Sequence, residues 1–170
     1  MWKNVILCIV LGVIATSAHY SIPGGSGSSK PGPVCPPPAC PESKDKCKLS
    51  AQENKKIVLD FYTQVFVKRN FSAVDIHYAP NIIQHNPHVG DGRKPFLDFM
   101  TSVKPVPVAI YRPVAECDLV YLHVKMITED DDSKPQAIVD IFRVECGKIV
   151  EHWDVIQPVI TNVGNPRPMF

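Results

Sequence analysis

Two acids and a histidine near the C-terminal end of the chain could carry out acid–base chemistry. Asp140, His152 and Asp154 lie within a ribbon of β-branched and aromatic residues, 138–157, that Cys146-Gly147 divides into two runs. This pattern predicts a β-hairpin. Charged groups are costly to bury unless they are paired or used, so three titratable groups in an apolar ribbon form a candidate site.

The register of this hairpin decides whether the three groups share a face. A three-residue loop, with Gly147 left-handed in a G1 bulge, would pair Val144 with Lys148 and Asp140 with His152. One face would then carry Ile138, Asp140, Phe142, Val150, His152, Asp154 and Ile156. A two-residue loop would instead pair Asp140 with Trp153 and turn His152 to the opposite face, because a one-residue slip flips every side chain. We expect the first register.

Asp140 and His152 are the predicted catalytic pair. A carboxylate that holds an imidazole fixes its tautomer and raises its basicity, so the pair could take a proton next to a carbonyl and return it elsewhere. The alternative is a buried structural ion pair that rigidifies the sheet. Asp154 could be a second acid or base, or lie in water at the mouth of a pocket lined by Phe142 and Val150.

Two further residues are weaker candidates. His85 precedes a turn at Asn86-Pro87 and could complete the site from the helical side, or simply bond local backbone. Tyr78 could donate its hydroxyl to a ligand or serve only in packing. A metal site could draw on His85, His88, Asp140, His152 and Asp154, but His85 and His88 flank a proline turn and no His-x-His is present, so we expect no metal. The sequence has no nucleotide-binding glycine motif and no nucleophile elbow, so we expect no cofactor.

The elements that must position these groups can be predicted from local patterns. Ser50-Ala-Gln-Glu53 is a capping box that begins an amphipathic helix ending near Lys68. Further helices are predicted at about 72–78 and 94–103, and strands at about 81–85, 108–114 and 119–128. Pro113 favours an edge position for the second of these strands, or the end of that strand. Helices followed by a strand meander predict an α+β domain, with a curved antiparallel sheet and about three helices on one face.

The motifs themselves resemble the SnoaL-like family. The resemblance rests on Ile83-Gln-His-Asn-Pro87, on Gly90-x-Gly92 and above all on the hairpin 140–154, and it covers about 49–159. This family belongs to the cone-shaped group typified by nuclear transport factor 2. The resemblance implies a bent sheet enclosing a blind pocket, and frequent dimers packed through the outer sheet face. Relatives include polyketide cyclases, dehydratases, isomerases and epoxide hydrolases, together with binding domains that have no chemistry.

Some site roles follow from that resemblance alone. In the polyketide cyclases an aspartate on the sheet acts as acid and base, and Asp140 matches it by type and approximate location. The resemblance also strengthens the case for His85. It does not settle function, because one fold hosts many activities.

The N-terminal third of the chain predicts export. Residues 1–18 have a basic start, an apolar run and small residues before a cut after Ala18, as a secretory signal does, although an uncleaved anchor helix is the alternative. Residues 19–48 are rich in Gly, Ser and Pro and predict a flexible tail. The folded domain is predicted at 49–160, with a second tail at 161–170.

An exported chain can form disulfides. After Cys8 leaves with the signal, five cysteines remain: Cys35, Cys40, Cys47, Cys117 and Cys146. Because five is an odd number, one cysteine is free or forms a disulfide with another chain. The last two fall at predicted turns at one end of the sheet, so a bridge between them could form. A zinc site in the tail is a competing interpretation, but no histidine there has ligand spacing.

The remaining features concern partners. Asn70-Phe-Ser72 is a glycosylation sequon. A net charge of +1 gives no reason to expect nucleic acid or an anionic membrane as a partner. Trp153, on the face opposite the candidate site, favours a homodimer. We therefore expect an extracellular domain that binds a small apolar carbonyl compound, with lyase, isomerase or cyclase chemistry, or else a non-catalytic binding or interaction module.

Overall fold

The structure is a computed structural model that describes residues 40, 47, 49–127, 135–160 and 164–170. The predicted signal at 1–18 and most of the predicted tail at 19–48 lie outside the described residues. Within the described ranges, no helix is long and apolar enough to cross a membrane.

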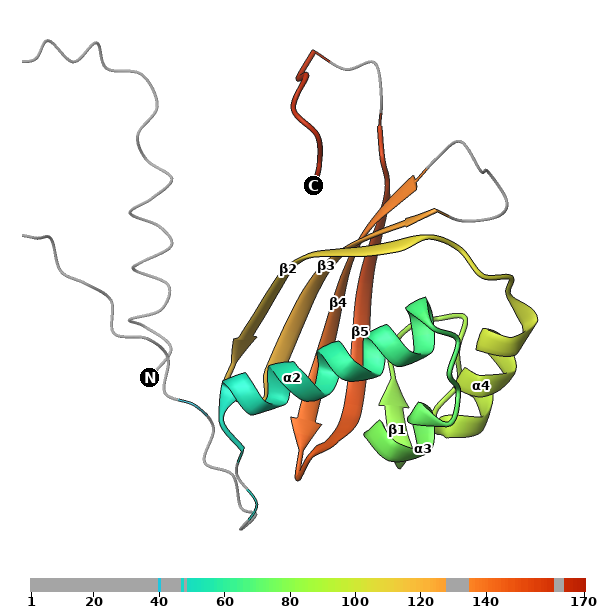
Figure 1. Cartoon of the computed structure of the whole chain (residues 1–170), viewed down its shortest axis with the longest axis vertical. Helices are drawn as coiled ribbons and strands as arrows, with labels where there is room; N and C mark the ends of the chain where they lie inside the picture. Colours follow the sequence, from blue (N-terminus) through green and yellow to red (C-terminus); the bar gives the residue numbers. More distant parts are fainter. Residues whose placement is uncertain (1–39, 41–46, 48, 128–134, 161–163) are drawn as a thin grey trace, which may run out of the picture. The chain divides into compact units, whose positions relative to one another are not determined.

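The described chain folds into helices on one face of a single sheet (Figure 1). The helical elements are α2 (Ala51–Tyr62), the π-helical turn η1 (Thr63–Val67), α3 (Ala73–His77) and α4 (Arg93–Ser102). The strands are β1 (Tyr78–Gln84), β2 (Val108–Glu116), β3 (Leu119–Ile127), β4 (Pro135–Glu145) and β5 (Lys148–Pro158). The predicted α+β architecture is confirmed.

Helix α2 begins where the capping box predicts. The Ser50 hydroxyl accepts from the Glu53 amide at 3.3 Å, and the Glu53 carboxylate accepts from the Ser50 amide at 2.8 Å. These bonds satisfy two of the amide groups that a helix leaves unpaired at its start. The inner side of the helix then buries Val58 and Phe61 completely against the sheet.

The sheet is mixed rather than wholly antiparallel. Its strand order is β1-β5-β4-β3-β2; the last four strands form an antiparallel meander, while β1 runs parallel to β5. The prediction of an antiparallel sheet is therefore wrong for β1, whose partner strand is far away along the chain and cannot be inferred from local pattern. Strand β2 lies at the edge, as Pro113 predicts.

The predicted register of the β4–β5 hairpin is wrong. Glu145 pairs with Lys148, so the loop has two residues, and both Cys146 and Gly147 have positive φ, 47° and 77°. Two left-handed residues form the tight turn that best matches strand twist. This turn is the two-residue loop that was the alternative to the predicted three-residue loop, and by itself it would move His152 to the outer face.

A bulge in β5 restores the face. Val144 pairs with Ile149 but Arg143 pairs with Glu151, so Val150 is an extra residue. Beyond it the order of faces is reversed once more, and Asp140 lies opposite Asp154, with Phe142 opposite His152. Val150, predicted to line the pocket, is instead the partly exposed extra residue of the bulge, and its neighbour Ile149 is fully buried.

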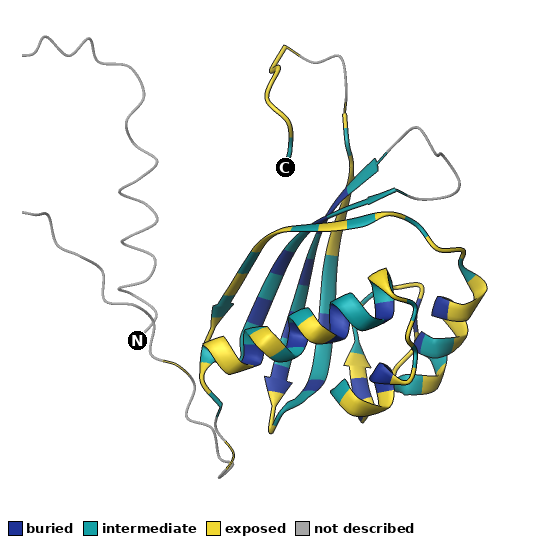
Figure 2. Ribbon diagram, in the orientation of Figure 1, coloured by how far each residue is buried: buried dark blue, intermediate teal, exposed yellow. Residues whose placement is uncertain are grey.

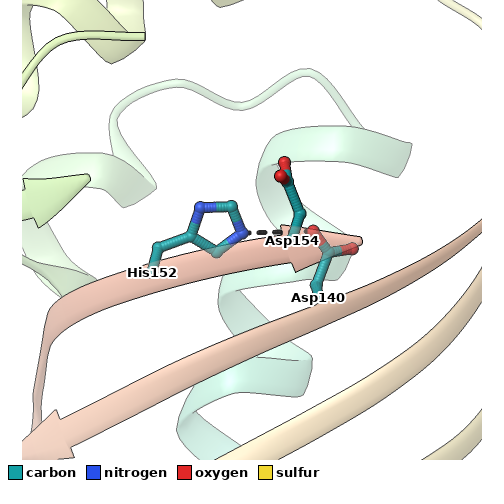
Figure 3. A group of neighbouring side chains, drawn as sticks. All are labelled: Asp140, His152 and Asp154. Atoms are coloured by element: carbon teal, nitrogen blue, oxygen red, sulfur yellow. Dashed lines mark hydrogen bonds and ion pairs between the residues drawn. The ribbon is translucent and has the colours of Figure 1, made fainter. Parts of the chain in front are cut away.

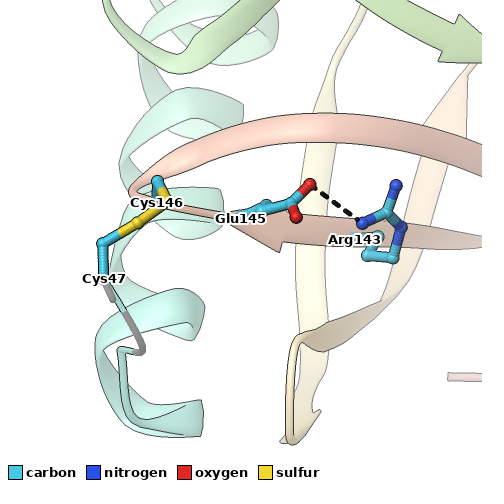
Figure 4. The surroundings of a disulfide bond; sticks show 4 residues. All are labelled: Cys47, Arg143, Glu145 and Cys146. Atoms are coloured by element: carbon cyan, nitrogen blue, oxygen red, sulfur yellow. Dashed lines mark hydrogen bonds and ion pairs between the residues drawn. A yellow bond between two sulfur atoms is a disulfide. The ribbon is translucent and has the colours of Figure 1, made fainter. Parts of the chain in front are cut away.

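Two disulfides join the predicted tail to the tips of the sheet. Cys40 is bonded to Cys117 and Cys47 to Cys146, the latter at the tip of the β4–β5 hairpin (Figure 4). The bridge between Cys117 and Cys146 that the sequence allows is therefore wrong, because each of these turn cysteines has a partner before α2. Cys35 lies outside the described residues.

The core lies between the helices and the inner sheet face, where residues alternate between buried and partly exposed along β3 (Figure 2). Three buried residues are polar or charged among those described: Asn54, Asp140 and His152. The Asn54 amide donates to the Cys117 carbonyl at 3.0 Å, so this side chain caps a turn and its burial is explained. Asp140 and His152 need another explanation.

Candidate functional site

Asp140 and His152 meet on the inner face of the sheet. Their side chains point the same way from β4 and β5, and His152 Nε2 lies 3.1 Å from Asp140 Oδ1 (Figure 3). They are 6% and 8% exposed. The structure thus brings together the predicted pair, as diagonal neighbours across the strands rather than as the directly opposed residues that the predicted register requires.

The second oxygen of Asp140 is held by a tyrosine from α2. The Tyr62 hydroxyl donates to Asp140 Oδ2 at 2.9 Å, and Tyr62 is 1% exposed. Burial, and then the charge of Asp140, raise the pKa of Tyr62 well above its usual value of 10.0, so the hydroxyl stays protonated and can only donate. The sequence marks Tyr62 as a core residue of an amphipathic helix and gives no signal of this contact.

The second nitrogen of His152 meets Gln84 from the end of β1. Parallel pairing of β1 with β5 sets Gln84 beside His152, and Gln84 Oε1 lies 2.7 Å from His152 Nδ1. The same oxygen accepts from the Asn86 amide at 3.1 Å. Gln84 lies in the Gln-His-Asn-Pro motif, but the prediction from that motif named His85 instead.

The structure places His85 outside the candidate site. Its ring stacks on Trp153 with centroids 4.7 Å apart, and its Nε2 lies 2.9 Å from Glu151 Oε1. Trp153 and Glu151 flank His152 on β5 and point to the opposite face, so the prediction that His85 completes the site is wrong. Burial raises the pKa of Glu151, but hydrogen bonds from His85 and Arg143 outweigh it, and that pKa lies below its usual value.

Two predicted lining residues do lie at the site. The Phe142 ring lies 4.7 Å from the His152 ring, and Tyr78 stacks on Phe61 at 4.4 Å. Tyr78 is 1% exposed, and burial followed by the charge of Asp140 raises its pKa well above 10.0. Its hydroxyl has no hydrogen-bond partner within the described part of the chain.

Asp154 is the most accessible of the three predicted acid–base groups. It lies opposite Asp140 and is partly exposed, and the Asn86 side-chain amide donates to its Oδ2. One nitrogen or oxygen from each of Asp140, His152 and Asp154 lies within 4.8 Å of the others (Figure 3). Two carboxylates and an imidazole at that spacing can pass a proton among themselves and to a bound molecule.

The same three side chains could also hold a divalent cation, since carboxylate and imidazole are common ligands. The spacing along the sequence gives no sign of such a set, which arises only when β4 and β5 pair. Each of the three already has a hydrogen-bond partner within the chain: Tyr62 for Asp140, Gln84 for His152 and Asn86 for Asp154.

Comparisons with solved structures support the fold. A putative ketosteroid isomerase from Kribbella flavida matches with a TM-score of 0.55 and 14% identity over 69% of this chain and 84% of that one. AclR, a putative hydroxylase from Streptomyces galilaeus, matches with a TM-score of 0.53 and 20% identity over 64% and 91%. An NTF-2 like protein from Burkholderia xenovorans matches with a TM-score of 0.56 and 18% identity over 67% and 91%. At such identities the likeness shows the fold alone.

Sequence comparison identifies the family. A search of curated proteins found no match. The family model described as SnoaL-like domain matches residues 58–152, which is more than half of the chain. That span includes Tyr62, Gln84, Asp140 and His152, so the residues that form the buried contacts all lie within it. The chain belongs to the SnoaL-like family and has the NTF2-like fold.

Proposed function

We propose that this domain binds a small, largely apolar, carbonyl-bearing molecule and moves a proton on it, as a lyase, isomerase or cyclase. The observation that carries this proposal is the buried contact between Asp140 and His152, oriented by Tyr62 and Gln84. Charged groups are costly to bury unless they are paired or used. The putative ketosteroid isomerase with a similar fold is in keeping with such chemistry.

The proposed reaction needs one proton removed and one returned. A base takes the proton from the carbon next to a carbonyl, the electron pair moves toward the carbonyl oxygen, and an acid then protonates a different atom. Asp140, His152 and Asp154 are the groups proposed for these transfers, with Asp154 nearest to solvent. Aromatic side chains around them, such as Phe142, keep the local dielectric constant low and strengthen each charge interaction.

The carbonyl oxygen of the ligand would be bound by the Tyr78 hydroxyl. A neutral hydroxyl fixed at the place where negative charge develops stabilises the enolate that forms there. Tyr78 suits this role because it is held by stacking on Phe61 and because its pKa keeps it protonated.

A non-catalytic secreted binding or interaction module is the second candidate. It is favoured by the fact that both oxygens of Asp140 and both ring nitrogens of His152 already have partners within the chain. A buried network whose groups are all hydrogen-bonded within the chain can have a purely structural role, which here is to fix α2 against the sheet. In that case a ligand would meet the polar groups only at Asp154 and Tyr78.

Export, dimer formation and glycosylation belong to the same proposal. Two disulfides suit an oxidising compartment, which supports secretion after cleavage of residues 1–18. The outer face carries Trp153 with the exposed Val114 and Val155, an apolar strip that a second copy would cover in a homodimer. We propose Asn70 as the glycosylated residue, since it is exposed in the turn before α3, where its side-chain nitrogen donates to Gln64 and its side-chain oxygen accepts from the Ser72 hydroxyl.

Mass spectrometry of small molecules that co-purify with the secreted protein would test this proposal. The recovered molecule is then incubated with the wild type, with Asp140→Asn and with the control Asp98→Asn, whose exposed carboxylate lies on α4. We expect turnover by the wild type and by the control, and loss of turnover in Asp140→Asn. Equal binding without turnover in all three would favour the binding module. Recovery of no small molecule with the secreted wild type would contradict the ligand-binding proposal.

A further inference from the structure

Gln84 decides which protons His152 can carry. Its side-chain oxygen has two neighbours, the Asn86 amide nitrogen at 3.1 Å and His152 Nδ1 at 2.7 Å. The side-chain amide of a glutamine can turn over, which exchanges its oxygen and nitrogen, so the orientation must be settled by the neighbours. A backbone amide is always a donor, and the atom that faces it must therefore be the oxygen.

This orientation fixes one proton of His152. Because Gln84 presents an oxygen, which only accepts, His152 Nδ1 must donate to it and therefore carries hydrogen. The 2.7 Å distance is that of a strong hydrogen bond. The tautomer with hydrogen on Nε2 alone would set two acceptors against each other at this contact.

The other nitrogen of His152 then needs a second proton nearby. Nε2 faces Asp140 Oδ1 at 3.1 Å, and a bare nitrogen beside a carboxylate oxygen would place two lone pairs in contact. A proton between them removes the conflict, whether it is nearer the ring or the carboxyl group. The other carboxyl oxygen of Asp140 accepts from the Tyr62 hydroxyl, so the proton shared with Nε2 lies on the Oδ1 side.

We infer that Gln84 is a positioning residue that keeps His152 protonated at Nδ1, so that the Asp140–His152 pair rests with a proton in its hydrogen bond and acts as an acid. The inferred role in a reaction rests on the proposed function, but the protonation of the ring does not. The titratable groups nearest to His152 are Asp140 from β4 and Asp154 from its own strand. Tyr62 from α2 and Tyr78 from β1 lie near Asp140, and Gln84, from β1, is uncharged.

The acid role differs from the role that the sequence predicts. A carboxylate beside an imidazole is expected to form a base. With Nδ1 donating to Gln84 and a proton already shared between Nε2 and Asp140, the imidazole has no free lone pair, so it can release a proton to the ligand but cannot take one up. The group that removes a proton would then be Asp154, which has one donor, Asn86, and is partly exposed.

Nitrogen NMR of the histidine rings tests this inference without any ligand. The full secreted chain is labelled with ¹⁵N and kept oxidised, and long-range ¹H–¹⁵N spectra report whether each ring nitrogen carries hydrogen. In the wild type near neutral pH we expect Nδ1 of His152 to give the signal of a protonated nitrogen. In Gln84→Met, which keeps the length of the side chain and loses the acceptor, we expect that signal to be lost.

Two controls separate this effect from general damage. Gln84→Glu keeps an acceptor oxygen and should keep the protonated Nδ1, while the ring of His123, on the outer face of β3, should not change in either variant. A bare Nδ1 in the wild type, or a protonated Nδ1 in Gln84→Met, would overturn the inference. If Gln84→Met does not fold, the inference is tested on the wild type and Gln84→Glu alone, and a bare Nδ1 in either of them would overturn it.

The outcome is separable from that of the proposed function. Loss of the Nδ1 proton in Gln84→Met with no turnover of any recovered molecule would leave Gln84 as a positioning residue in a protein without chemistry. Turnover by a wild type whose Nδ1 is bare would leave the proposed function in place and exclude the Asp140–His152 pair as the acid.

Discussion

Replacing Tyr62 by phenylalanine isolates the bond that holds Asp140 from α2. The ring remains, with its stacking on Phe66 at 4.3 Å, and only the hydroxyl that donates to Asp140 at 2.9 Å is lost. A buried acceptor then has no donor on that side. Hydrogen bonds to charged groups contribute about 1.5 to 3 kcal/mol, and both residues are buried, so solvent cannot replace the donor.

We therefore expect Tyr62→Phe to lower the free energy of unfolding by about 2 kcal/mol. For a domain of this size such a loss lowers Tm by roughly 8 °C. Urea unfolding of the oxidised protein, followed by Trp153 fluorescence, measures the change, and an unaltered dependence on urea shows that the folded and unfolded states keep their compactness. Tyr121→Phe, on the outer face of β3, is the matched control and should change stability by less than about 0.5 kcal/mol.

A double-mutant cycle links the loss to Asp140. If the Tyr62 hydroxyl acts through that carboxylate, Tyr62→Phe should cost markedly less in an Asp140→Asn background than in the wild type. A loss no larger than that of the Tyr121→Phe control would show that Asp140 does not depend on Tyr62. An equal loss in both backgrounds would show that the hydroxyl acts elsewhere.

Three further predictions concern pH, cross-links and modification. The pKa values of Tyr62 and Tyr78 are raised above 10.0 in the folded state, so the unfolded state binds fewer protons than the folded state above pH 10. The free energy of unfolding should therefore fall above pH 10 by up to about 1.4 kcal/mol per pH unit for each tyrosine. Urea unfolding at several pH values measures this slope, and Tyr78→Phe should reduce it. A slope unchanged by the substitution would contradict this. Replacing Cys47 and Cys146 together by serine removes a disulfide between residues 99 positions apart, and should lower the free energy of unfolding by about 4 kcal/mol. A double variant as stable as the wild type in urea would refute this prediction. Protein from a eukaryotic secretory host should lose mass on treatment with an N-glycosidase, and Asn70→Gln should not; no loss from the wild type would contradict glycosylation at Asn70.

The helices could be predicted because local signals determine them. The capping box at Ser50 and Glu53 begins α2, and the apolar residues of that helix recur at the spacing that faces a core. The alternation in β3 predicts its buried side in the same way, with Val120 and Leu122 fully buried. These signals lie within a few residues of the element that they specify.

The hairpin register could not be predicted because two independent features determine it. The two-residue turn at Cys146-Gly147 alone would put His152 on the outer face, and the bulge at Val150 alone would do the same. Together they cancel, so the predicted face is right although the predicted pairing is wrong. Nothing in the run of β-branched residues around Val150 marks one position rather than another for the bulge.

The partners of the buried pair could not be predicted for a different reason. In the Gln-His-Asn-Pro motif, neighbouring residues point to opposite faces, and the phase of β1 against β5 decides which one points inward. The chemistry of histidine favours His85, but the phase places Gln84 inside and His85 outside. Tyr62 cannot be told from a packing tyrosine in the sequence, since its partner is 78 positions away.

The cross-links also determine how the oxidised molecule would respond to a pulling force. A force between the two ends of the chain would enter at residue 40, pass along the chain to Cys47, cross to Cys146 and leave through β5. Everything from α2 to β4 would be bypassed and could not be extended while that bond is intact. Strand β5 alone would be stripped from its neighbours. His152 and Asp154 lie on β5, while Tyr62, Gln84 and Asp140 lie inside the closed ring, so stretching would take the buried pair apart before any helix unfolds.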